Sequence, residues 1–164
     1  MKSKKREARR PKVLVDTSFL LPALGVEVEE EVIDSIPLLR RVEVLYLEIA
    51  VVEAMWKVLR VVPPGGMERV ALGLEAIKRT YRAVNPPPEA YVEASEIYYR
   101  GHRDYIDALN YSTAKLLGIP FLTIDLEFAQ FLEENGYEVE GIIVTPSKFK
   151  EMVGERSRQS GTDT

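Results

Sequence analysis

The fold is decided by the stretch KVLVDTS at residues 12–18, a short apolar run that ends on an acid. Uninterrupted branched aliphatic side chains at 13–15 are typical of a strand that is buried on both faces of a parallel sheet. Asp16 follows directly, and the hydroxyls of Thr17 and Ser18 can cap the first turn of a helix. The stretch therefore predicts a buried strand, an acid at its carboxyl end and a helix behind it.

The same alternation of strands and helices continues along the chain. Strands are predicted at 12–15, 42–47, 121–124 and 139–144, and helices at 29–41, 49–61, 67–84, 89–100, 103–117, 126–135 and, as a short last helix, from 145. Breaks rich in proline and glycine at 63–66 and 85–88 separate three of these helices. Alternating elements of this kind predict an α/β fold, a three-layer α/β/α domain with a mostly parallel sheet of four to five strands.

The charge is distributed unevenly between three expected segments: a basic flexible arm at 1–11, a folded domain at 12–153 and a disordered tail at 154–164. Seven of the 22 basic residues lie within 1–12, whereas 13–164 hold 15 basic and 25 acidic residues. The arm is either a solubilising tail or a phosphate-binding arm. The acidic body argues against a general nucleic-acid coat protein.

Composition restricts the chemistry that is available. A chain of 164 residues, 46% of them hydrophobic, suits one domain with a substantial core. It has no cysteine and a single histidine, His102, which excludes thiol nucleophiles and zinc sites rich in cysteine or histidine and argues against a Ser-His-Asp triad. No apolar run approaches the ~18–20 residues that span a bilayer, so we expect a cytoplasmic protein with no membrane partner.

Helical periodicity gives two apolar stripes. Val52, Met55, Trp56 and Leu59 have helical spacing in the segment 49–61, and a second stripe follows in 67–84. Such stripes most often belong to the core, and we expect that role here. The alternative is that they form a dimer face.

Aspartate is used sparingly, at positions that favour a site. The chain has 20 Glu but only six Asp, and four of the six flank apolar segments: Asp16, Asp104, Asp107 and Asp125. Ligands bind at the carboxyl ends of the strands in open α/β sheets, so Asp16, Glu53, Asp107 and Asp125 are expected to converge there. Mg²⁺ or Mn²⁺ would relieve the repulsion of four carboxylates and could activate water at a phosphodiester.

Each of these acids also has a purely structural interpretation. Asp16 and Asp125 could be helix N-caps, and Asp104 and Asp107 could be first-turn acids favoured by the helix dipole. Glu53 could be an exposed helix residue. Because all four quartet positions share one edge of the predicted sheet, the set favours a site more than any single member does.

The ordered set of motifs resembles the PIN-domain ribonucleases, and within them the toxin-type, VapC-like group. The resemblance covers roughly residues 12–150. It rests on VLVDTSFLL at 13–21, VVEAMWKVL at 51–59, YIDAL at 105–109, AKLLGIP at 114–120, LTID at 122–125 and the closing IVTPSKF at 143–149. Its most specific part is the separation of Asp107 and Asp125 by 18 residues across a Gly-x-Pro turn.

This resemblance implies a Mg²⁺- or Mn²⁺-dependent endoribonuclease that hydrolyses phosphodiester bonds of single-stranded or looped RNA. The implied catalytic and metal-binding quartet is Asp16, Glu53, Asp107 and Asp125, with Asp104 as the second choice for Asp107 and Glu48 as a weaker competitor for Glu53. Thr17 and Thr123 would be supporting hydroxyls. The resemblance further implies an antitoxin protein as partner and a homodimer.

RNA contacts are expected from the arm and from rings near Asp104. The expected contacts are Lys4, Lys5, Arg9, Arg10 and Tyr105. Tyr98, Tyr99 and His102 could also stack on unpaired bases, or could be ordinary structural residues.

Two other functions stay open at this point. A catalytically degenerate PIN domain would act as an RNA-binding or assembly module, although all four acids are present. A structure-specific DNA nuclease of related fold would need extra DNA-binding elements, for which 164 residues leave little room. A dinucleotide site is excluded because no Gly-rich turn follows any predicted strand.

Overall fold

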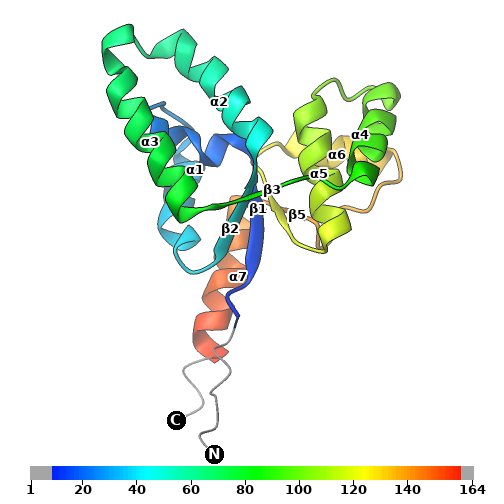
Figure 1. Cartoon of the computed structure of the whole chain (residues 1–164). Coiled ribbons are helices and arrows are strands. Elements are labelled where there is room, and N and C mark those ends of the chain that lie inside the picture. The colour runs from blue at the N-terminus through cyan, green and yellow to red at the C-terminus, as the bar shows by residue number, and fades with distance from the viewer. Residues whose placement is uncertain (1–8, 160–164) are drawn as a thin grey trace, which may run out of the picture.

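A computed structural model describes residues 9–159, with side chains described for residues 9–155 (Figure 1). Its centre is a five-stranded, all-parallel sheet with the strand order β3-β2-β1-β4-β5. The strands are β1 (Lys12–Val15), β2 (Glu43–Leu47), β3 (Arg82–Val84), β4 (Phe121–Leu122) and β5 (Ile143–Val144). The predicted α/β class and parallel sheet are confirmed.

Seven α-helices and three 3₁₀ helices surround this sheet in the described part of the chain. The α-helices are α1 (Glu30–Leu39), α2 (Glu48–Val61), α3 (Met67–Thr80), α4 (Pro88–Arg100), α5 (Tyr105–Leu117), α6 (Leu126–Glu134) and α7 (Pro146–Gln159). The 3₁₀ helices are η1 (Thr17–Phe19), η2 (Leu21–Leu24) and η3 (Pro64–Gly66). None of the helices within residues 9–159 has the length and apolar character needed to cross a membrane.

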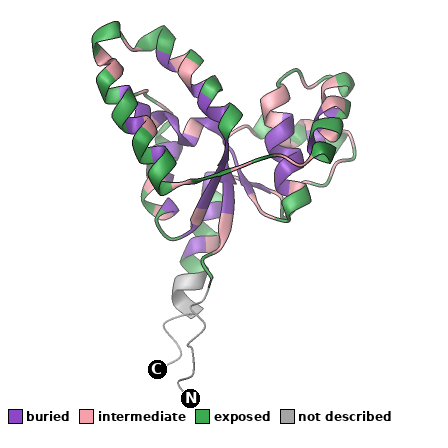
Figure 2. Ribbon diagram, viewed as in Figure 1, coloured by how far each residue is buried: buried purple, intermediate pink, exposed green. Residues whose placement is uncertain are grey.

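Two hydrophobic cores lie on opposite faces of the sheet, because successive residues of a strand point to opposite sides. Val13 and Val15 belong to the core formed with α1, α2, α3 and α7, whereas Leu14 belongs to the core formed with α4, α5 and α6. In Figure 1 the first three helices and the middle three form two lobes on either side of the strands, and Figure 2 shows the buried residues concentrated between them. This is the three-layer arrangement that the sequence predicts.

Four predicted boundaries differ from the structure. The helix predicted to reach 84 ends at Thr80, and Arg82–Val84 instead pairs with β2 as an edge strand. This strand escapes a sequence pattern because it has three residues and is largely exposed. The strands predicted at 121–124 and 139–144 are each only two residues long, and α7 continues to Gln159, beyond the tail boundary expected at 154.

The predicted core stripe of the helix at 49–61 is wrong. Trp56 and Leu59 are 62% and 66% exposed, and Val52 is exposed as well. The buried face of α2 consists of Ala50, Val51, Ala54 and Val58. Small side chains on that face bring α2 close to the sheet, which leaves its larger apolar residues on the surface.

Candidate functional site

Carboxylates gather at the carboxyl ends of β1 and β4, where a pocket of about 310 Å³ opens. The pocket is lined by Asp16, Thr17, Ser18, Glu53, Lys57, Asp104, Asp107, Ile124 and Asp125. Five of these nine side chains are acidic and one is basic. The four acids of the expected quartet and Asp104 therefore share one pocket, although they come from four separate parts of the chain.

Asp16 is held in place by Ser18 of η1 and by Thr123, the residue after β4. Its Oδ1 accepts the backbone N–H of Ser18 at 2.6 Å, and its Oδ2 accepts the hydroxyl of Thr123 at 2.7 Å. The Thr123 oxygen in turn accepts the backbone N–H of Asp125 at 3.1 Å, which links the acids that follow β1 and β4. Burial raises the pKa of Asp16, while the hydrogen bonds from Thr123 and Ser18 lower it and the charge of Glu53 raises it.

Glu53 enters the pocket from the second turn of α2. Its Oε2 accepts the hydroxyl of Thr17, and its Oε1 lies 3.8 Å from the ammonium of Lys57 one turn further along the helix. Glu48, the weaker competitor for this position, instead forms an ion pair of 2.5 Å with Lys78 of α3 and does not line the pocket.

Asp107 is a second carboxylate of the pocket with a raised pKa. Burial raises its pKa to about 6, against a lowering by His102 and further raising by the charges of Asp104, Asp16 and Asp125. The Nε2 of His102 lies 3.7 Å from Asp107 Oδ2. Since three other acids act on this one group, the pocket concentrates negative charge, with Lys57 as the single basic residue of its lining.

Structural roles explain part of the acid pattern. Asp104 is the N-cap of α5, where its Oδ1 accepts the backbone N–H groups of Ile106 and Asp107 at 3.0 and 3.2 Å. Asp125 caps α6 through the N–H of Phe128 at 2.8 Å. Asp107 has no such capping role, which supports Asp107 over Asp104 as the acid that is available for chemistry.

The carboxylates of the pocket are the kind of ligand that a divalent cation prefers, but their oxygens are not spaced as a metal site. No three acidic or histidine side chains among the described residues lie close enough together to hold a metal ion as they stand. The acids therefore surround the pocket without forming the coordination sphere that four converging carboxylates would make, because several are drawn toward the caps and hydroxyls at the walls. Their chemistry nevertheless suits Mg²⁺ or Mn²⁺, since every donor is a carboxylate oxygen and the raised pKa of Asp107 would be relieved by a cation.

A second hollow continues from the acid pocket and shares Glu53, Lys57 and Asp104 with it. Its volume is about 540 Å³, and its other lining residues are Trp56, Arg60, Arg103, Tyr105 and Ile106. Its lining includes the exposed indole of Trp56 and three cationic side chains, one of which is Lys57. Trp56, Arg60 and Arg103 were missed from the sequence, because the indole fits a core stripe and the two arginines are unremarkable surface residues there.

The expected RNA contacts are spread over the molecule. Lys4 and Lys5 lie outside the described residues. Arg9 and Arg10 are exposed, and Arg10 lines a different cavity, at the amino ends of the strands. Tyr105 lines the hollow beside the acid pocket, where its hydroxyl donates to the backbone oxygen of Tyr91 at 2.9 Å.

The rings near Asp104 have separate environments. His102 stacks on Phe128 with ring centroids 4.2 Å apart, so one of its faces is covered and base stacking there is blocked. Arg103 covers Tyr98 at 4.7 Å from the ring centroid. Tyr99 is on the surface with 82% exposure, away from the residues that line either pocket. The functional contact that sequence reasoning missed is that of His102 with Asp107.

Comparison with known proteins bears on the fold and the family. Residues 13–132 match the family described as PIN domain. The crystal structure of VapC20 from Mycobacterium tuberculosis, described as a Sarcin-Ricin loop cleaving toxin, is similar with a TM-score of 0.56 and 19% identity, over 77% of this chain and 97% of that one. The structure of PAE2754 from Pyrobaculum aerophilum gives the same TM-score and identity, over 88% and 90% of the two chains.

Comparison with curated protein sequences gave no match. At 19% identity the two crystal structures support the fold. The family match spans β1 to α6 and includes all five acids of the pocket. The chain therefore belongs to the PIN-domain family, whose nucleases are hydrolases that act on nucleic acids.

Proposed function

We propose that the protein is a Mg²⁺- or Mn²⁺-dependent endoribonuclease that cleaves single-stranded or looped RNA. The observation that carries this proposal is the single pocket in which Asp16, Glu53, Asp107 and Asp125 meet, with the pKa of Asp107 raised to about 6. Perturbed carboxylates in a cleft at the carboxyl edge of a parallel sheet are typical of a catalytic site. The four acids, with Asp104 in second place, would hold the cation.

The cation, when bound, would supply activation of water and neutralisation of the charge that develops on the phosphodiester. The chain's own residues prepare the site for it. Thr123 and Ser18 fix the carboxylate of Asp16, and Thr17 fixes that of Glu53, so neither acid has to be oriented during the reaction. The hydroxyl-bearing Thr17 and Thr123 are the supporting residues in the proposal.

The hollow beside the acid pocket supports RNA as the substrate. Unpaired bases commonly stack on aromatic rings, and phosphates pair with cationic side chains. Trp56 offers an exposed ring, and Arg60 and Arg103 offer cations within the same hollow. A strand laid along it would reach the acids with its phosphate backbone, while Tyr105 forms part of the wall.

The toxin-type assignment, an antitoxin partner, a homodimer and a cytoplasmic location belong to the same proposal. The VapC20 toxin has the same fold, and exposed apolar side chains on α2 and α3 offer a surface for a protein partner. Ile49, Val52, Leu59 and Leu72 are all more than 40% exposed. Contiguous apolar surface of this kind commonly marks a protein interface.

Cleavage of defined oligonucleotides tests the proposal. We expect cleavage of single-stranded RNA that stops with a chelator, returns with Mg²⁺ or Mn²⁺, and is lost in Asp16→Asn. The matched control is Asp34→Asn, which removes one exposed aspartate of α1 outside the pocket and should leave the rate unchanged. Full activity of purified Asp16→Asn, or activity that does not depend on the ion, would contradict the proposal.

One observation favours a second function, that of a degenerate PIN domain that binds RNA without cutting it. The acids do not form a ready coordination sphere, and Asp16 and Asp125 both serve as N-caps. RNA binding without cleavage under any divalent ion, together with no heat of ion binding in calorimetry, would establish this alternative. Cleavage of matched DNA in place of RNA would identify a DNA nuclease instead.

A further inference from the structure

A large cavity lies at the opposite end of the strands from the acid pocket. Its volume is about 870 Å³. It is lined by Arg10, Ile36, Leu39, Arg40, Val42, Glu43, Val44, Arg79, Thr80, Tyr81 and Arg82. These residues precede or begin β1, β2 and β3, or end α1 and α3, so the cavity opens at the amino ends of the strands.

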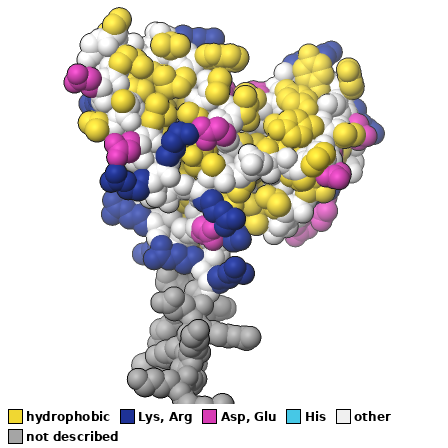
Figure 3. All heavy atoms as spheres, in the orientation of Figure 1, with side chains coloured by type: hydrophobic (Ala, Val, Ile, Leu, Met, Phe, Trp, Pro, Cys, Tyr) yellow, Lys and Arg dark blue, Asp and Glu magenta, His cyan; other side chains and the backbone are white. Residues whose placement is uncertain are grey.

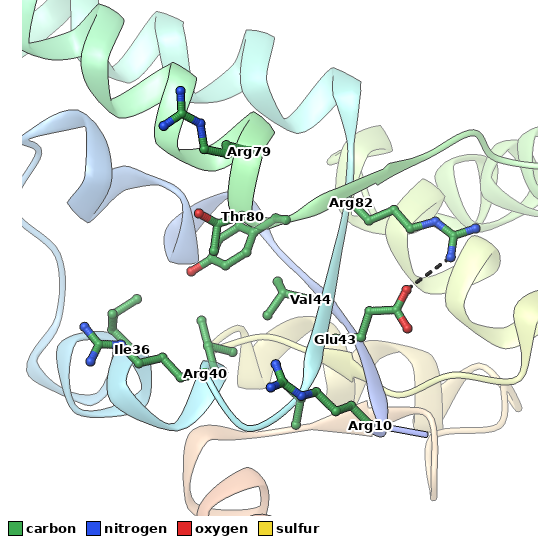
Figure 4. A pocket seen from close by; sticks show the side chains of 11 residues that line it. Arg10, Ile36, Arg40, Glu43, Val44, Arg79, Thr80 and Arg82 are labelled. Carbon is green, nitrogen blue, oxygen red and sulfur yellow. Dashed lines mark hydrogen bonds and ion pairs between the residues drawn. The ribbon is translucent and has the colours of Figure 1, made fainter. Parts of the chain in front are cut away.

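The charge of this cavity is the reverse of that of the acid pocket. Four of its lining side chains are guanidinium groups, and a single one, Glu43, is acidic. Arg82 pairs with Glu43 at 3.1 Å, as the dashed line in Figure 4 marks, and Arg79 pairs with Glu75 of its own helix. Neither Arg10 nor Arg40 forms a hydrogen bond or ion pair with any side chain that the structure describes. Two guanidinium groups are thus available to an anion.

The floor of the cavity is apolar. Leu39, Val42 and Val44 are buried, and Ile36 is half-buried beside them. Tyr81 completes the lining, and burial raises the pKa of its hydroxyl while the nearby charge of Arg40 lowers it. In Figure 4 the labelled arginines surround this floor, with Arg79 on one side and Arg40 and Arg10 on the other.

These features fit one class of ligand better than others. A volume of about 870 Å³ is far larger than a lone phosphate needs and suits a nucleotide unit. All four cations are arginine, whose planar fork binds phosphate through two hydrogen bonds and stacks on bases. In the sequence, Arg10 belongs to the basic segment 1–12, which has seven cations. Basic residues that run on along the chain favour a polymer of phosphates over a small anion.

We infer that this arginine-lined cavity binds the phosphate backbone and one base of single-stranded RNA, at a site remote from cleavage. The inference rests on the proposed function, in which RNA is the substrate, and adds a second contact for that substrate. Figure 3 shows Lys and Arg side chains gathered in the lower part of the face drawn, and mainly apolar side chains above. The second contact would raise affinity for longer RNA without entering the reaction.

Fluorescence anisotropy of a labelled single-stranded 12-mer RNA, measured on the full chain in EDTA, tests the inference. EDTA keeps the RNA intact, so binding is measured even if the protein never cleaves. Arg10→Gln and Arg40→Gln should each weaken binding roughly three- to tenfold and lower the slope of log Kd against log salt by ~0.7 for each phosphate that the variant no longer binds. The control is Arg69→Gln, which removes an exposed arginine of α3 outside the cavity and should change Kd less than twofold.

Cleavage separates this inference from the proposed function. Arg40→Gln should raise KM for the 12-mer by a similar factor, leave kcat unchanged, and leave cleavage of a trinucleotide untouched because so short an RNA cannot reach both edges. Weaker binding by Arg40→Gln in a protein that cleaves nothing would support the cavity and refute the nuclease. If the unsubstituted protein cleaves RNA but Arg40→Gln and Arg69→Gln bind the 12-mer with equal Kd, the cavity inference is refuted and the nuclease proposal stands.

A polyglutamate peptide of matched charge distinguishes RNA from an acidic protein partner. We expect the RNA to bind more tightly than the peptide. Tighter binding of the peptide, abolished in Arg40→Gln, would assign the cavity to a protein and overturn the inference. Arg40→Lys provides a further check, because it keeps the charge but not the fork and should restore only part of the affinity. Circular dichroism and thermal unfolding confirm that each variant is folded.

Discussion

The acid pocket and the arginine-lined cavity lie at opposite ends of the strands and have opposite charge. At the carboxyl edge five acids share a pocket with one lysine, and burial raises the pKa of Asp107 and Asp16. At the amino edge four arginines and one glutamate surround an apolar floor. The charges of the neighbouring acids raise the pKa of Asp107, whereas two of the four arginines are paired with glutamates. We propose chemistry at the first site and RNA attachment at the second.

The largest effect should be the loss of kcat when an acid of the pocket is substituted, compared with an arginine of the cavity. Asp16→Asn should lower kcat by ~10²–10³-fold, the usual cost of removing one preorganised polar group from an active site. Arg40→Gln should leave kcat unchanged. Single-turnover cleavage of labelled RNA at saturating enzyme measures both. Equal losses of kcat in the two variants would break the separation of roles.

Stability should change with pH in a direction set by Asp107. Its pKa is raised from 3.8 to about 6 in the folded protein, so the folded state binds more protons than the unfolded state between these values. The contribution of Asp107 to the free energy of unfolding should therefore be largest below pH 4 and fall by ~1–3 kcal/mol as the pH rises through about 6.

Asp107→Asn removes this charge and should raise the free energy of unfolding at pH 7 by ~1–3 kcal/mol, with little effect at pH 3.5. Urea unfolding at the two pH values measures the change, and Asp34→Asn is the control. Mg²⁺ should stabilise the unsubstituted protein more than Asp107→Asn. A destabilised Asp107→Asn at pH 7 would show that the acid edge is not under electrostatic strain.

Substitution of Trp56 tests whether the hollow beside the acid pocket binds RNA. Because its ring is 62% exposed, Trp56→Ala should leave the melting temperature almost unchanged. Loss of one stacked base should weaken RNA binding by ~1–3 kcal/mol, which is about 5–150-fold. Anisotropy in EDTA measures this, with Leu59→Ala, a similarly exposed residue outside the hollow, as the control. Equal effects of the two variants would argue for a general apolar contact.

The smallest effect concerns the hydroxyl that links the two strands. Thr123→Val keeps the shape of the side chain but loses the bonds to Asp16 and Asp125 N–H, and should lower kcat by about tenfold. Thr123→Ser should restore most of the rate, and KM should change little in either variant. A loss of stability without any change in kcat would give Thr123 a structural role only.

Sequence reasoning found the parts of the fold that local patterns encode. The apolar run before Asp16 and the helix signals around it predict the strand and the turn, and parallel topology then brings Asp125 to the same edge. It failed where tertiary packing decides. Arg82–Val84 has no apolar pattern and becomes a strand only because β2 offers it an edge. Trp56 is on the surface because Ala50 and Ala54 take the buried face of α2.

The candidate site was predictable to the same degree. The acids could be found because Asp16 and Asp125 follow predicted strands, and Glu53, Asp104 and Asp107 lie in the first two turns of predicted helices. How their oxygens are used could not, since the caps and hydroxyl contacts depend on side-chain geometry. The arginine-lined cavity was missed for a related reason. Arg10, Arg40 and the pair Arg79 and Arg82 come from three separate parts of the chain, which become neighbours only when the strand order is known.

The shortness of the strands has a consequence for any RNA that contacts both edges. β1 has four residues, so the edges are separated by roughly 13 Å of sheet, and helices cover both of its faces. A molecule that contacts both edges must pass around the outside of the domain and turn sharply within a few nucleotides. A continuous duplex is too stiff to follow that path. The shape of the domain would thus exclude paired RNA from contacting both sites, without any base-specific contact.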